Sequence, residues 1–209
     1  MIARAAILST GDELTTGRIV DTNSSWIADK LFEIGVDVAA VLTVGDYPER
    51  LEWAWRHALE LADVVVSTGG IGPTADDLTT ETVGRVLARP LVEDAASADR
   101  IRRFFEGRGV AMPVNNLKQA LIPAGAVIVP NPLGTAPGYR VEHDDRHVVV
   151  LPGVPPSGPA MPVMAIATSA PKRRRAPSAI SAAVSSLTAP CASSVSWRTP
   201  RIACLAGFE

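Results

Sequence analysis

The stretch that most constrains the fold is a glycine-rich segment, Thr68-Gly-Gly-Ile-Gly-Pro-Thr-Ala-Asp-Asp-Leu-Thr79. It follows an apolar run from Asp63 to Ser67 and precedes a helical pattern from about Thr79 to Leu87. Glycines let a backbone approach a phosphate closely. Free N–H groups and the positive dipole at the start of the following helix favour negative charge. The order of strand, glycine loop and helix therefore predicts an anion-binding turn.

Two adjacent carboxylates complicate this interpretation. Asp76 and Asp77 stand at the end of the segment, where they would repel a bare phosphate. We expect either a metal ion between them and the ligand, or a carboxylate that has a chemical task. The segment is not a nucleoside-triphosphate P-loop, because no Gly-Lys-Ser/Thr follows it, and it does not match the dinucleotide fingerprint.

Strands and helices alternate along the first three quarters of the chain. We expect strands at 2–8, 36–44, 63–67, 126–129, 139–142 and 147–151, and helices at 22–34, 48–61, 79–87, 95–107 and 115–121. This alternation predicts an α/β fold with a parallel or mixed sheet covered on both faces. Ligands of such sheets bind beyond the carboxyl ends of the strands. We therefore expect the loops at 9–17, 45–49, 68–77 and 152–155 to meet at one edge, and the direction of the loop at 131–138 stays open.

Composition argues against several classes of protein. The 209 residues carry a formal net charge of −2, so no global charge draws the chain to nucleic acid or to an anionic membrane. No apolar run approaches the roughly 20 residues of a membrane span, and the N-terminus lacks a signal-peptide cleavage site. We expect a cytoplasmic protein. The two cysteines, Cys191 and Cys204, offer neither metal-site spacing nor a disulfide framework.

The character of the sequence changes near Pro156. No acidic residue occurs from Arg146 to Phe208, Ala, Ser and Pro dominate, and Lys172-Arg-Arg-Arg175 is a basic run. We predict one domain over residues 1–156 and a tail over residues 157–209. Two interpretations of the tail stay open: a disordered cationic segment, or out-of-frame translation of a GC-rich gene. Retranslating the nucleotide sequence in the other two frames tests the second.

Residues 1 to about 155 resemble the N-terminal domain of the CinA family (competence/damage-inducible protein A), which is similar to molybdopterin-binding domains. The matching motifs, in family order, are Ser9-Thr-Gly-Asp-Glu-Leu14, Gly17-Arg-Ile-Val-Asp-Thr-Asn23, Val44-Gly-Asp46, the glycine-rich segment, Asn115-Asn-Leu-Lys-Gln-Ala-Leu121, Asn131-Pro-Leu-Gly-Thr-Ala-Pro-Gly138 and Leu151-Pro-Gly-Val-Pro155. The resemblance implies a three-layer α/β/α domain that binds a nucleotide or a pterin, and a homo-oligomer. The nicotinamide-nucleotide amidase domain of full-length family members has no counterpart here, so we expect no amidase activity.

The resemblance also implies a reaction. In the CinA family this domain is associated with metal-dependent hydrolysis of ADP-ribose, so we expect hydrolysis of the pyrophosphate of ADP-ribose or a similar nucleotide. Two alternatives stay open: a molybdopterin-binding or adenylyl-transferring domain, and a truncated, inactive protein. The molybdopterin relatives usually carry a basic residue where Asp76 stands here. This departure favours a metal-assisted site over adenylyl transfer.

The site residues follow from these motifs. Asp77 and Asp46 match two acidic positions of the relatives and are the predicted catalytic residues. Asp77, Asp76 and Glu13 are the predicted ligands of a divalent metal such as Mg²⁺ or Mn²⁺, which prefers oxygen donors. The predicted ligand contacts are Thr10, Gly11, Asn23, Thr68, Gly69, Gly70, Gly72, Pro73, Lys118, Thr135 and Gly153. We expect no haem, flavin or iron–sulfur cluster, and a small nucleotide or pterin as partner rather than nucleic acid or membrane.

Simpler structural roles compete with the catalytic ones. Asp77 could cap the helix that begins near Thr79, and Asp46 with Glu49 has the spacing of a capping pair for the helix at 48–61. The three glycines could simply form a tight turn. For the helix at 22–34, Thr22 or Asn23 is the expected N-cap.

Overall fold

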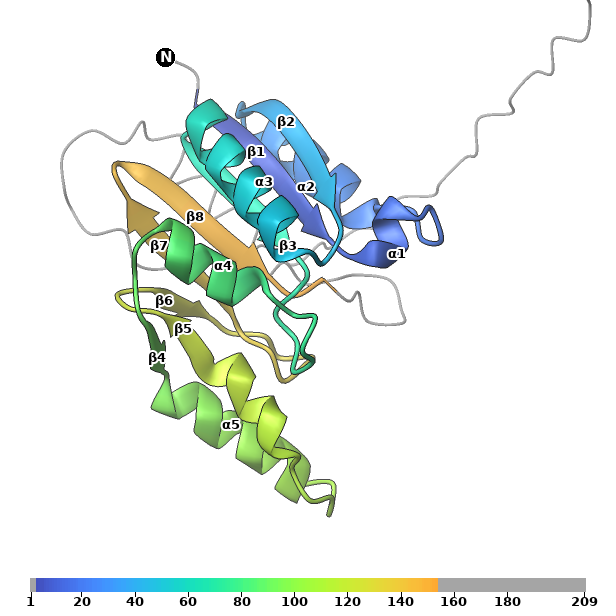
Figure 1. Cartoon of the computed structure of the whole chain (residues 1–209), viewed down its shortest axis with the longest axis vertical. Coiled ribbons are helices and arrows are strands. Elements are labelled where there is room, and N and C mark those ends of the chain that lie inside the picture. The colour runs from blue at the N-terminus through green and yellow to red at the C-terminus, as the bar shows by residue number, and fades with distance from the viewer. Residues whose placement is uncertain (1–2, 154–209) are drawn as a thin grey trace, which may run out of the picture.

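The computed structural model describes residues 3–153, which form one six-stranded sheet with helices on both faces and a small additional lobe (Figure 1). The strands of this sheet are β1 (Arg4–Thr10), β2 (Asp37–Val44), β3 (Val64–Thr68), β6 (Val127–Val129), β7 (Gly138–His143) and β8 (Arg146–Leu151). The predicted tail at 157–209 lies outside the described residues.

Strand direction brings the loops of interest to one edge. The order is β2-β1-β3-β8-β7-β6, and β1 pairs in parallel with β2 and β3, as β3 does with β8. Strand β7 runs antiparallel to both β8 and β6, so β6 points the same way as the parallel strands. The predicted mixed, mostly parallel sheet is confirmed. The direction of the loop at 131–138 is now settled: it follows β6 and joins the other loops at the carboxyl edge.

Helices cover both faces of the sheet, as the predicted three layers require. On one face lies α2 (Thr22–Glu33), which buries Ile27 and Leu31, four residues apart, against β1 and β3. On the other lie α3 (Pro48–Leu61) and α4 (Thr79–Val86) (Figure 1). Trp55 of α3 is fully buried in the core beneath them. The central strands β1 and β3 are buried on both sides, and for this reason β3 is a continuous apolar and small-residue run.

The predicted hairpin between β7 and β8 is confirmed. Its two turn residues, Asp144 and Asp145, have φ values of 46° and 62°. Two successive left-handed residues match the right-handed twist of the paired strands. Aspartate tolerates this conformation better than most residues do.

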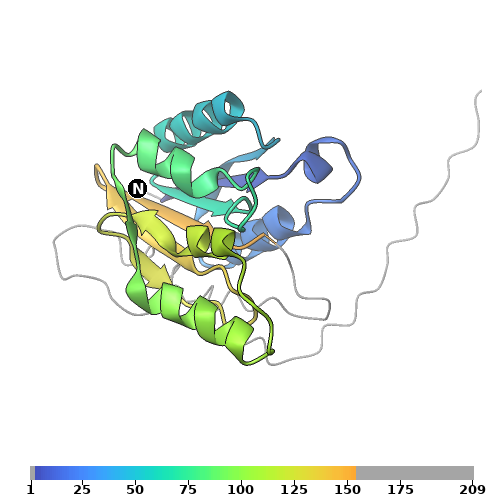
Figure 2. The same ribbon diagram turned by 60° about the horizontal axis from the view of Figure 1, so that its bottom comes forward.

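A small lobe interrupts the main sheet between α4 and β6. It contains β4 (Leu91–Glu93), α5 (Ala95–Glu106), the 3-10 helix η1 (Val114–Ala120) and β5 (Leu121–Pro123), with β4 and β5 paired antiparallel. Its own small core consists of Ala98, Ile101 and Ala120. Figure 2 brings the lobe forward and shows α5 on its outer side. Strands β4 and β5 were not predicted, because each has only three residues and adjoins or contains a proline, Pro90 before β4 and Pro123 in β5.

The predicted helix caps were wrong. Asp21, not Thr22 or Asn23, caps α2, with its Oδ1 atom 2.9 Å from the backbone nitrogen of Ser24. Helix α3 starts after Tyr47 with a proline at its first turn and has no side-chain cap, so Asp46 and Glu49 form no capping pair. Helix α4 also lacks a side-chain cap, and Asp77 is therefore free of that role.

The loop at 9–17 contains one further element, the short helix α1 (Asp12–Thr15). Within residues 3–153, no helix combines the length and the apolar character that a membrane crossing needs.

Candidate functional site

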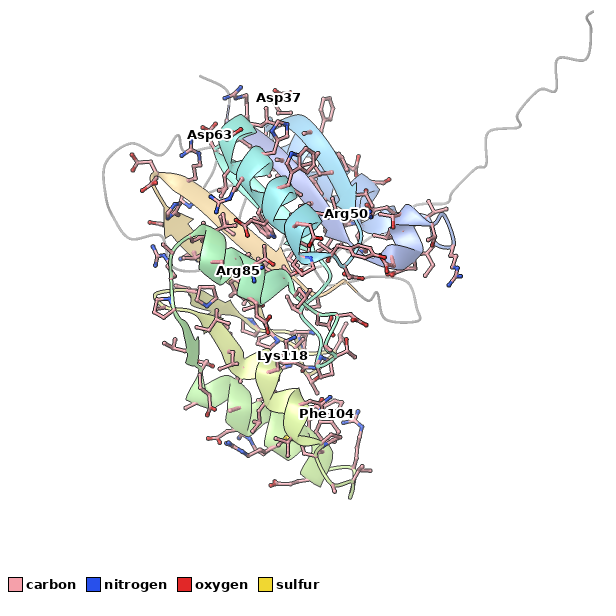
Figure 3. All side chains as sticks on the ribbon, in the orientation of Figure 1. Asp37, Arg50, Asp63, Arg85, Phe104 and Lys118 are labelled. Carbon is pink, nitrogen blue, oxygen red and sulfur yellow. The ribbon has the colours of Figure 1, made fainter. Side chains whose placement is uncertain are left out.

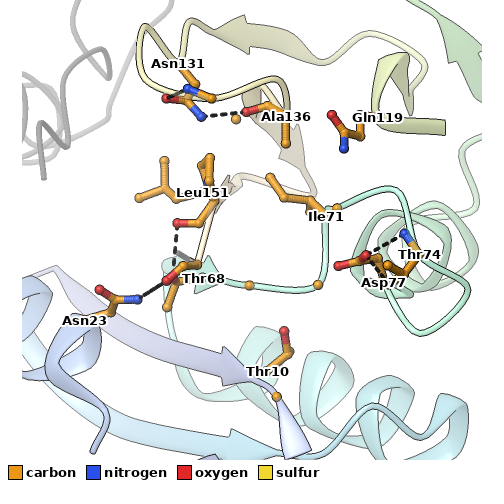
Figure 4. Close-up of a pocket in the computed structure, with 18 of the residues that line it drawn as sticks. Thr10, Asn23, Thr68, Ile71, Thr74, Asp77, Gln119, Asn131, Ala136 and Leu151 are labelled. Atoms are coloured by element: carbon orange, nitrogen blue, oxygen red, sulfur yellow. Dashed lines mark hydrogen bonds between the residues drawn. The ribbon is translucent and has the colours of Figure 1, made fainter. Parts of the chain in front are cut away.

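A pocket of about 630 Å³ lies at the carboxyl edge of the sheet, where the loops after β1, β3, β6 and β8 meet (Figure 4). Ten predicted ligand contacts line it: Thr10, Gly11, Asn23, Thr68, Gly69, Gly70, Gly72, Pro73, Thr135 and Gly153. The predicted carboxylates Glu13, Asp46, Asp76 and Asp77 line it as well. The volume lies within the range of roughly 300–1,000 Å³ that is typical of small-molecule sites.

The glycines after β3 are required by packing. Gly69 and Gly70 have φ values of 99° and 66°, in the left-handed region. A Cβ atom on Gly69 would lie 2.6 Å from the carbonyl oxygen of Thr10, and one on Gly70 would collide with the hydroxyl of Thr79. Because no side chain fits at either position, the loop backbone itself forms this wall of the pocket.

The free N–H groups lie slightly further along the loop than the sequence predicts. The N–H of Gly69 donates to the carbonyl of Leu151 at 3.1 Å, and the N–H of Thr79 donates to that of Gly70 at 3.0 Å. Among the described residues, the N–H groups of Gly70, Ile71 and Gly72 have no backbone acceptor. Residues 70–72 are therefore the part of the loop whose N–H groups can bind an anion. The N–H groups of Gly69 and of Thr79, the first residue of α4, are already used.

Asn23 ties together the segments beneath the pocket. Its Nδ2 atom donates to the carbonyl of Gly153 at 2.7 Å and to the hydroxyl of Thr68 at 3.3 Å (Figure 4). The Thr68 hydroxyl donates in turn to the carbonyl of Pro152 at 3.4 Å. Asn23 thereby joins the start of α2 to the ends of β3 and β8, and its amide donors are already used.

Asp77 closes the glycine loop. Its Oδ2 atom accepts hydrogen bonds from the backbone nitrogen of Thr74 at 2.8 Å and from the Thr74 hydroxyl at 2.5 Å (Figure 4). A Cβ atom on Gly72 would lie 2.6 Å from the same oxygen. Both bonds end on Oδ2, so the second carboxylate oxygen of this half-buried side chain remains for a ligand.

Asp46 faces Asp12 across two loops. The Oδ2 atom of Asp46 accepts from the backbone nitrogen of Asp12 at 3.2 Å, and the Oδ1 atom of Asp12 accepts from that of Asp46 at 3.2 Å. Burial raises the pKa of Asp46, the hydrogen bond from Asp12 lowers it, and the negative charges of Asp12, Glu13 and Asp77 raise it further. The net effect is a raised pKa. The carboxylates of Asp12, Glu13 and Asp77 therefore act electrostatically on Asp46 at this rim of the pocket.

Lys118 does not line the main pocket. Its Nζ atom donates to the carbonyl of Thr74 at 3.0 Å and lies 3.4 Å from Glu81 (Figure 3). Asn115, from the same 3-10 helix, donates to the carbonyl of Pro73 at 3.2 Å. The lobe thereby holds the outer side of the glycine loop, and Lys118 supports the loop from behind.

The lobe also holds the loop between β6 and β7. Arg100 of α5 donates to the carbonyl of Gly134 at 3.0 Å. Within that loop, Asn131 donates to the carbonyl of Ala136 at 2.9 Å and accepts from the backbone nitrogen of Leu133 at 3.1 Å (Figure 4). Asn131 lies in the motif at 131–138, but the sequence does not predict it as a site residue. Its role depends on a local turn that residue type alone does not reveal.

Other pocket residues were also missed. Ile71, Gln119, Leu133, Ala136 and Leu151 line the pocket. Four of them are apolar or small, and such residues give no chemical signal in a sequence. Gln119 directly follows Lys118 in the motif at 115–121.

Comparison with known proteins gives a consistent result. Residues 6–168 match the family described as "Probable molybdopterin binding domain". The chain is 45% identical over 152 residues to a putative competence-damage inducible protein of Thermoanaerobacter sp. (strain X514) and, to the same degree, to a CinA-like protein of Dictyoglomus thermophilum. Each match covers 73% of this chain and 37% of the relative, so the chain matches well under half the length of these proteins.

The fold also resembles a solved structure. The crystal structure of the protein CinA from Thermoplasma acidophilum superposes with a TM-score of 0.67 at 35% sequence identity. The match covers 72% of this chain and 89% of that one.

Proposed function

This chain belongs to the family of probable molybdopterin binding domains and, within it, to the CinA-like proteins, and from this premise we propose that its pocket binds a nucleotide and hydrolyses its pyrophosphate. One observation carries the proposal. The same pocket has backbone N–H donors at 70–72 and carboxylates at Asp46 and Asp77. Donors for phosphate oxygens and carboxylates for proton transfer are the two components that hydrolysis of a phosphoanhydride requires.

The glycine loop binds the diphosphate. The N–H groups of Gly70, Ile71 and Gly72 point to no other backbone acceptor within residues 3–153. Because Asn115 and Lys118 fix the carbonyls of the loop from behind, the donors are held in place before the ligand arrives. Preorganised donors stabilise the charge that develops on the phosphoryl oxygens without reorganising during the reaction.

Asp46 is the general base. Its oxygen takes a proton from a water molecule while the water oxygen forms a bond to one phosphorus. The bond from that phosphorus to the bridging oxygen breaks, and the bridging oxygen leaves with the other phosphate. For ADP-ribose the products are AMP and ribose 5-phosphate. A raised pKa suits Asp46 to this role, because a base works best when its pKa lies closer to the working pH.

The carboxylate oxygens are the donor type that a hard divalent cation prefers, but the side chains alone do not form a complete metal site. Among residues 3–153, no three Asp, Glu, His or Cys side chains lie close enough together to hold a metal ion alone. Mg²⁺ in nucleotide sites is usually bound by one or two carboxylates and the substrate phosphates. One or two of the predicted ligands Asp77, Asp76 and Glu13, together with the substrate phosphates, would hold the ion here, because the three do not lie close enough to bind it jointly. When bound, it would neutralise phosphoryl charge and acidify water.

The family description supports a second candidate, binding of a molybdopterin-type ligand without hydrolysis. The pocket has room for a pterin, and its N–H donors suit a pterin phosphate equally well. Asp76, at a position where adenylyl-transferring relatives usually carry a basic residue, argues against the transferase form of this alternative.

A turnover assay distinguishes the candidates. The full chain is incubated with ADP-ribose and Mg²⁺, Mn²⁺ or Co²⁺, and the products are separated by ion-exchange chromatography. The proposal predicts AMP and ribose 5-phosphate in equal amounts, and none in excess EDTA. Selective binding of a pterin without any turnover would favour the second candidate. Absence of both binding and turnover would favour an inactive protein.

A further inference from the structure

Part of the pocket wall is apolar and includes Ile71, Val129, Leu133 and Ala136. Surfaces of this kind bind flat, uncharged ring systems, and a few polar groups among them set the orientation. In a nucleotide or a pterin phosphate, the heterocycle is the part that suits such walls.

One polar side chain interrupts these walls without an evident structural role. Gln119 lines the pocket and is 7% exposed. Its Oε1 atom is sealed from solvent and has no hydrogen-bond partner among residues 3–153. Figure 4 shows its carboxamide near Ile71 and Ala136. Buried amides are nearly always hydrogen-bonded in folded proteins, so an unpaired one requires an explanation.

The structure holds Gln119 firmly in this position. It is carried by η1, next to Ala120, whose side chain is fully buried in the core of the lobe. The carbonyl of Ala120 accepts from the backbone nitrogen of Asp94 at 2.8 Å. On the other side, Lys118 fixes η1 to the glycine loop. The backbone that carries Gln119 at the pocket wall is therefore fixed.

Three other buried side-chain atoms within the described residues also lack partners. Trp55 Nε1 and Ser67 Oγ belong to residues that do not line the pocket, whereas Asp21 lines it and has an unpaired Oδ2 atom. The position of Asp21 has a structural reason, because its Oδ1 atom caps α2. For the unpaired carboxamide oxygen of Gln119 no such structural bond is present among residues 3–153.

We propose that Gln119 is a specificity-determining residue that hydrogen-bonds the amino-bearing edge of the ligand's heterocycle. A carboxamide presents an acceptor and a donor side by side. An amino group next to a ring nitrogen presents the complementary pair, and glutamine forms this pairing with adenine. Adenine and pterin both have such an edge. For adenine the inference rests on the proposed nucleotide hydrolysis, whereas for pterin it does not.

Binding of matched ligand pairs tests this role. Calorimetry on the full chain compares ADP-ribose with its purine analogue, in which hydrogen replaces the amino group, and compares pterin with pteridin-4-one, which lacks the amino group. Wild-type protein is expected to prefer one amino-bearing ligand by about tenfold or more. The pair that shows the preference identifies the heterocycle as adenine or pterin.

The variant Gln119→Met keeps a similar side-chain volume and removes both hydrogen-bonding atoms. We expect it to bind both members of the pair equally, with the loss confined to the amino-bearing ligand. Its ligand-free melting temperature should equal or exceed that of wild type, because an unpaired buried polar atom is gone. Val114→Ala, at an exposed position of the same 3-10 helix, is the control and should keep the preference. Gln119→Leu provides a second apolar replacement.

The outcomes distinguish failure of the proposed Gln119 contact from failure of the proposed hydrolysis. A preference for ADP-ribose that survives in Gln119→Met and Gln119→Leu would overturn the inference and leave the proposed hydrolysis standing. A pterin preference lost in these variants, with no nucleotide binding, would support the inference and overturn the hydrolysis. A lower ligand-free melting temperature with an unchanged preference would assign Gln119 a structural role. Binding of none of the four ligands would overturn both.

Discussion

Two aspartates at the pocket have different surroundings although both follow the end of a strand. Asp77 is held by Thr74 and shapes the glycine loop. Asp46 is half-buried among other carboxylates and has a raised pKa. Neither caps a helix. The sequence left capping and catalytic roles open for both, because a carboxylate shortly before a helix is typical of either. Only the positions of Asp12 and Thr74 in the fold decide against capping.

The raised pKa of Asp46 predicts a pH-dependent stability. The folded protein holds the Asp46 proton more tightly than the unfolded chain does. This contribution to stability is fully present below the unfolded pKa and is lost as the pH rises through the folded pKa. At neutral pH the ionised carboxylate is therefore destabilising relative to a neutral amide. Asp46→Asn should have a higher free energy of unfolding than wild type at pH 7, and this advantage should vanish near pH 3, where Asp46 is protonated.

Urea denaturation in EDTA at both pH values measures this difference. Asparagine retains an oxygen acceptor for the N–H of Asp12, so the substitution changes charge more than hydrogen bonding. A variant that is less stable than wild type by the same amount at both pH values would show that the hydrogen bond, not the charge, governs Asp46.

Asp77→Asn separates loop support from chemistry. The amide oxygen can still accept from Thr74, so we expect a loss of stability below about 1 kcal/mol. Loss of the negative charge should reduce ADP-ribose turnover at least about 100-fold. Asp37→Asn, at the amino end of β2 and far from the pocket (Figure 3), is the control and should keep wild-type turnover. Retained turnover in Asp77→Asn would remove Asp77 from the catalytic residues.

At the scale of elements, the lobe and the glycine loop form one functional unit. Asn115 and Lys118 hold the glycine loop, and Arg100 holds the loop after β6. An excursion of the chain between α4 and β6 thus fixes both loops that face each other across the pocket. The sequence placed Lys118 in the site through its motif, but the contact with Thr74 joins residues 44 positions apart. Such contacts follow from the fold and not from local pattern.

Two glycines with nearly equal φ values test the packing of the loop. Gly70 has φ 66° and Gly109 has φ 64°, but a Cβ atom on Gly70 meets two threonine hydroxyls, whereas one on Gly109 meets nothing within 4 Å. Gly109→Ala should cost about 1 kcal/mol of stability through backbone strain alone. Gly70→Ala should cost roughly 2–3 kcal/mol, because steric overlap is added to the same strain, and should abolish phosphate binding. Equal losses in urea denaturation would show that the loop relaxes around the new methyl group.

At the scale of the whole molecule, the alternating pattern predicted the main architecture. The strands are β-branched or continuous apolar runs, the longer helices repeat apolar residues every three or four positions, and Gly35, with φ 76°, follows the end of α2. Three short elements, α1, β4 and β5, were missed because they carry no period, whereas the equally short β6 was predicted from its apolar run. The position of the pocket could be predicted from the sequence because parallel strands share a carboxyl edge. The unpaired Oε1 atom of Gln119 and the hydrogen bond of the Gly69 N–H could not be predicted, because both depend on which segments pack together.

The chain spans 37% of the length of its CinA-like relatives, so the proposed hydrolysis is an activity of this domain by itself. The homo-oligomer and the cytoplasmic location stay predictions. The most direct test is ³¹P NMR of the full chain with ADP-ribose and Mg²⁺ or Mn²⁺ in ¹⁸O-labelled water. The account predicts that the pyrophosphate signals give way to two phosphomonoester signals and that one ¹⁸O atom enters one of the two products. Pyrophosphate signals that persist with every metal would contradict it.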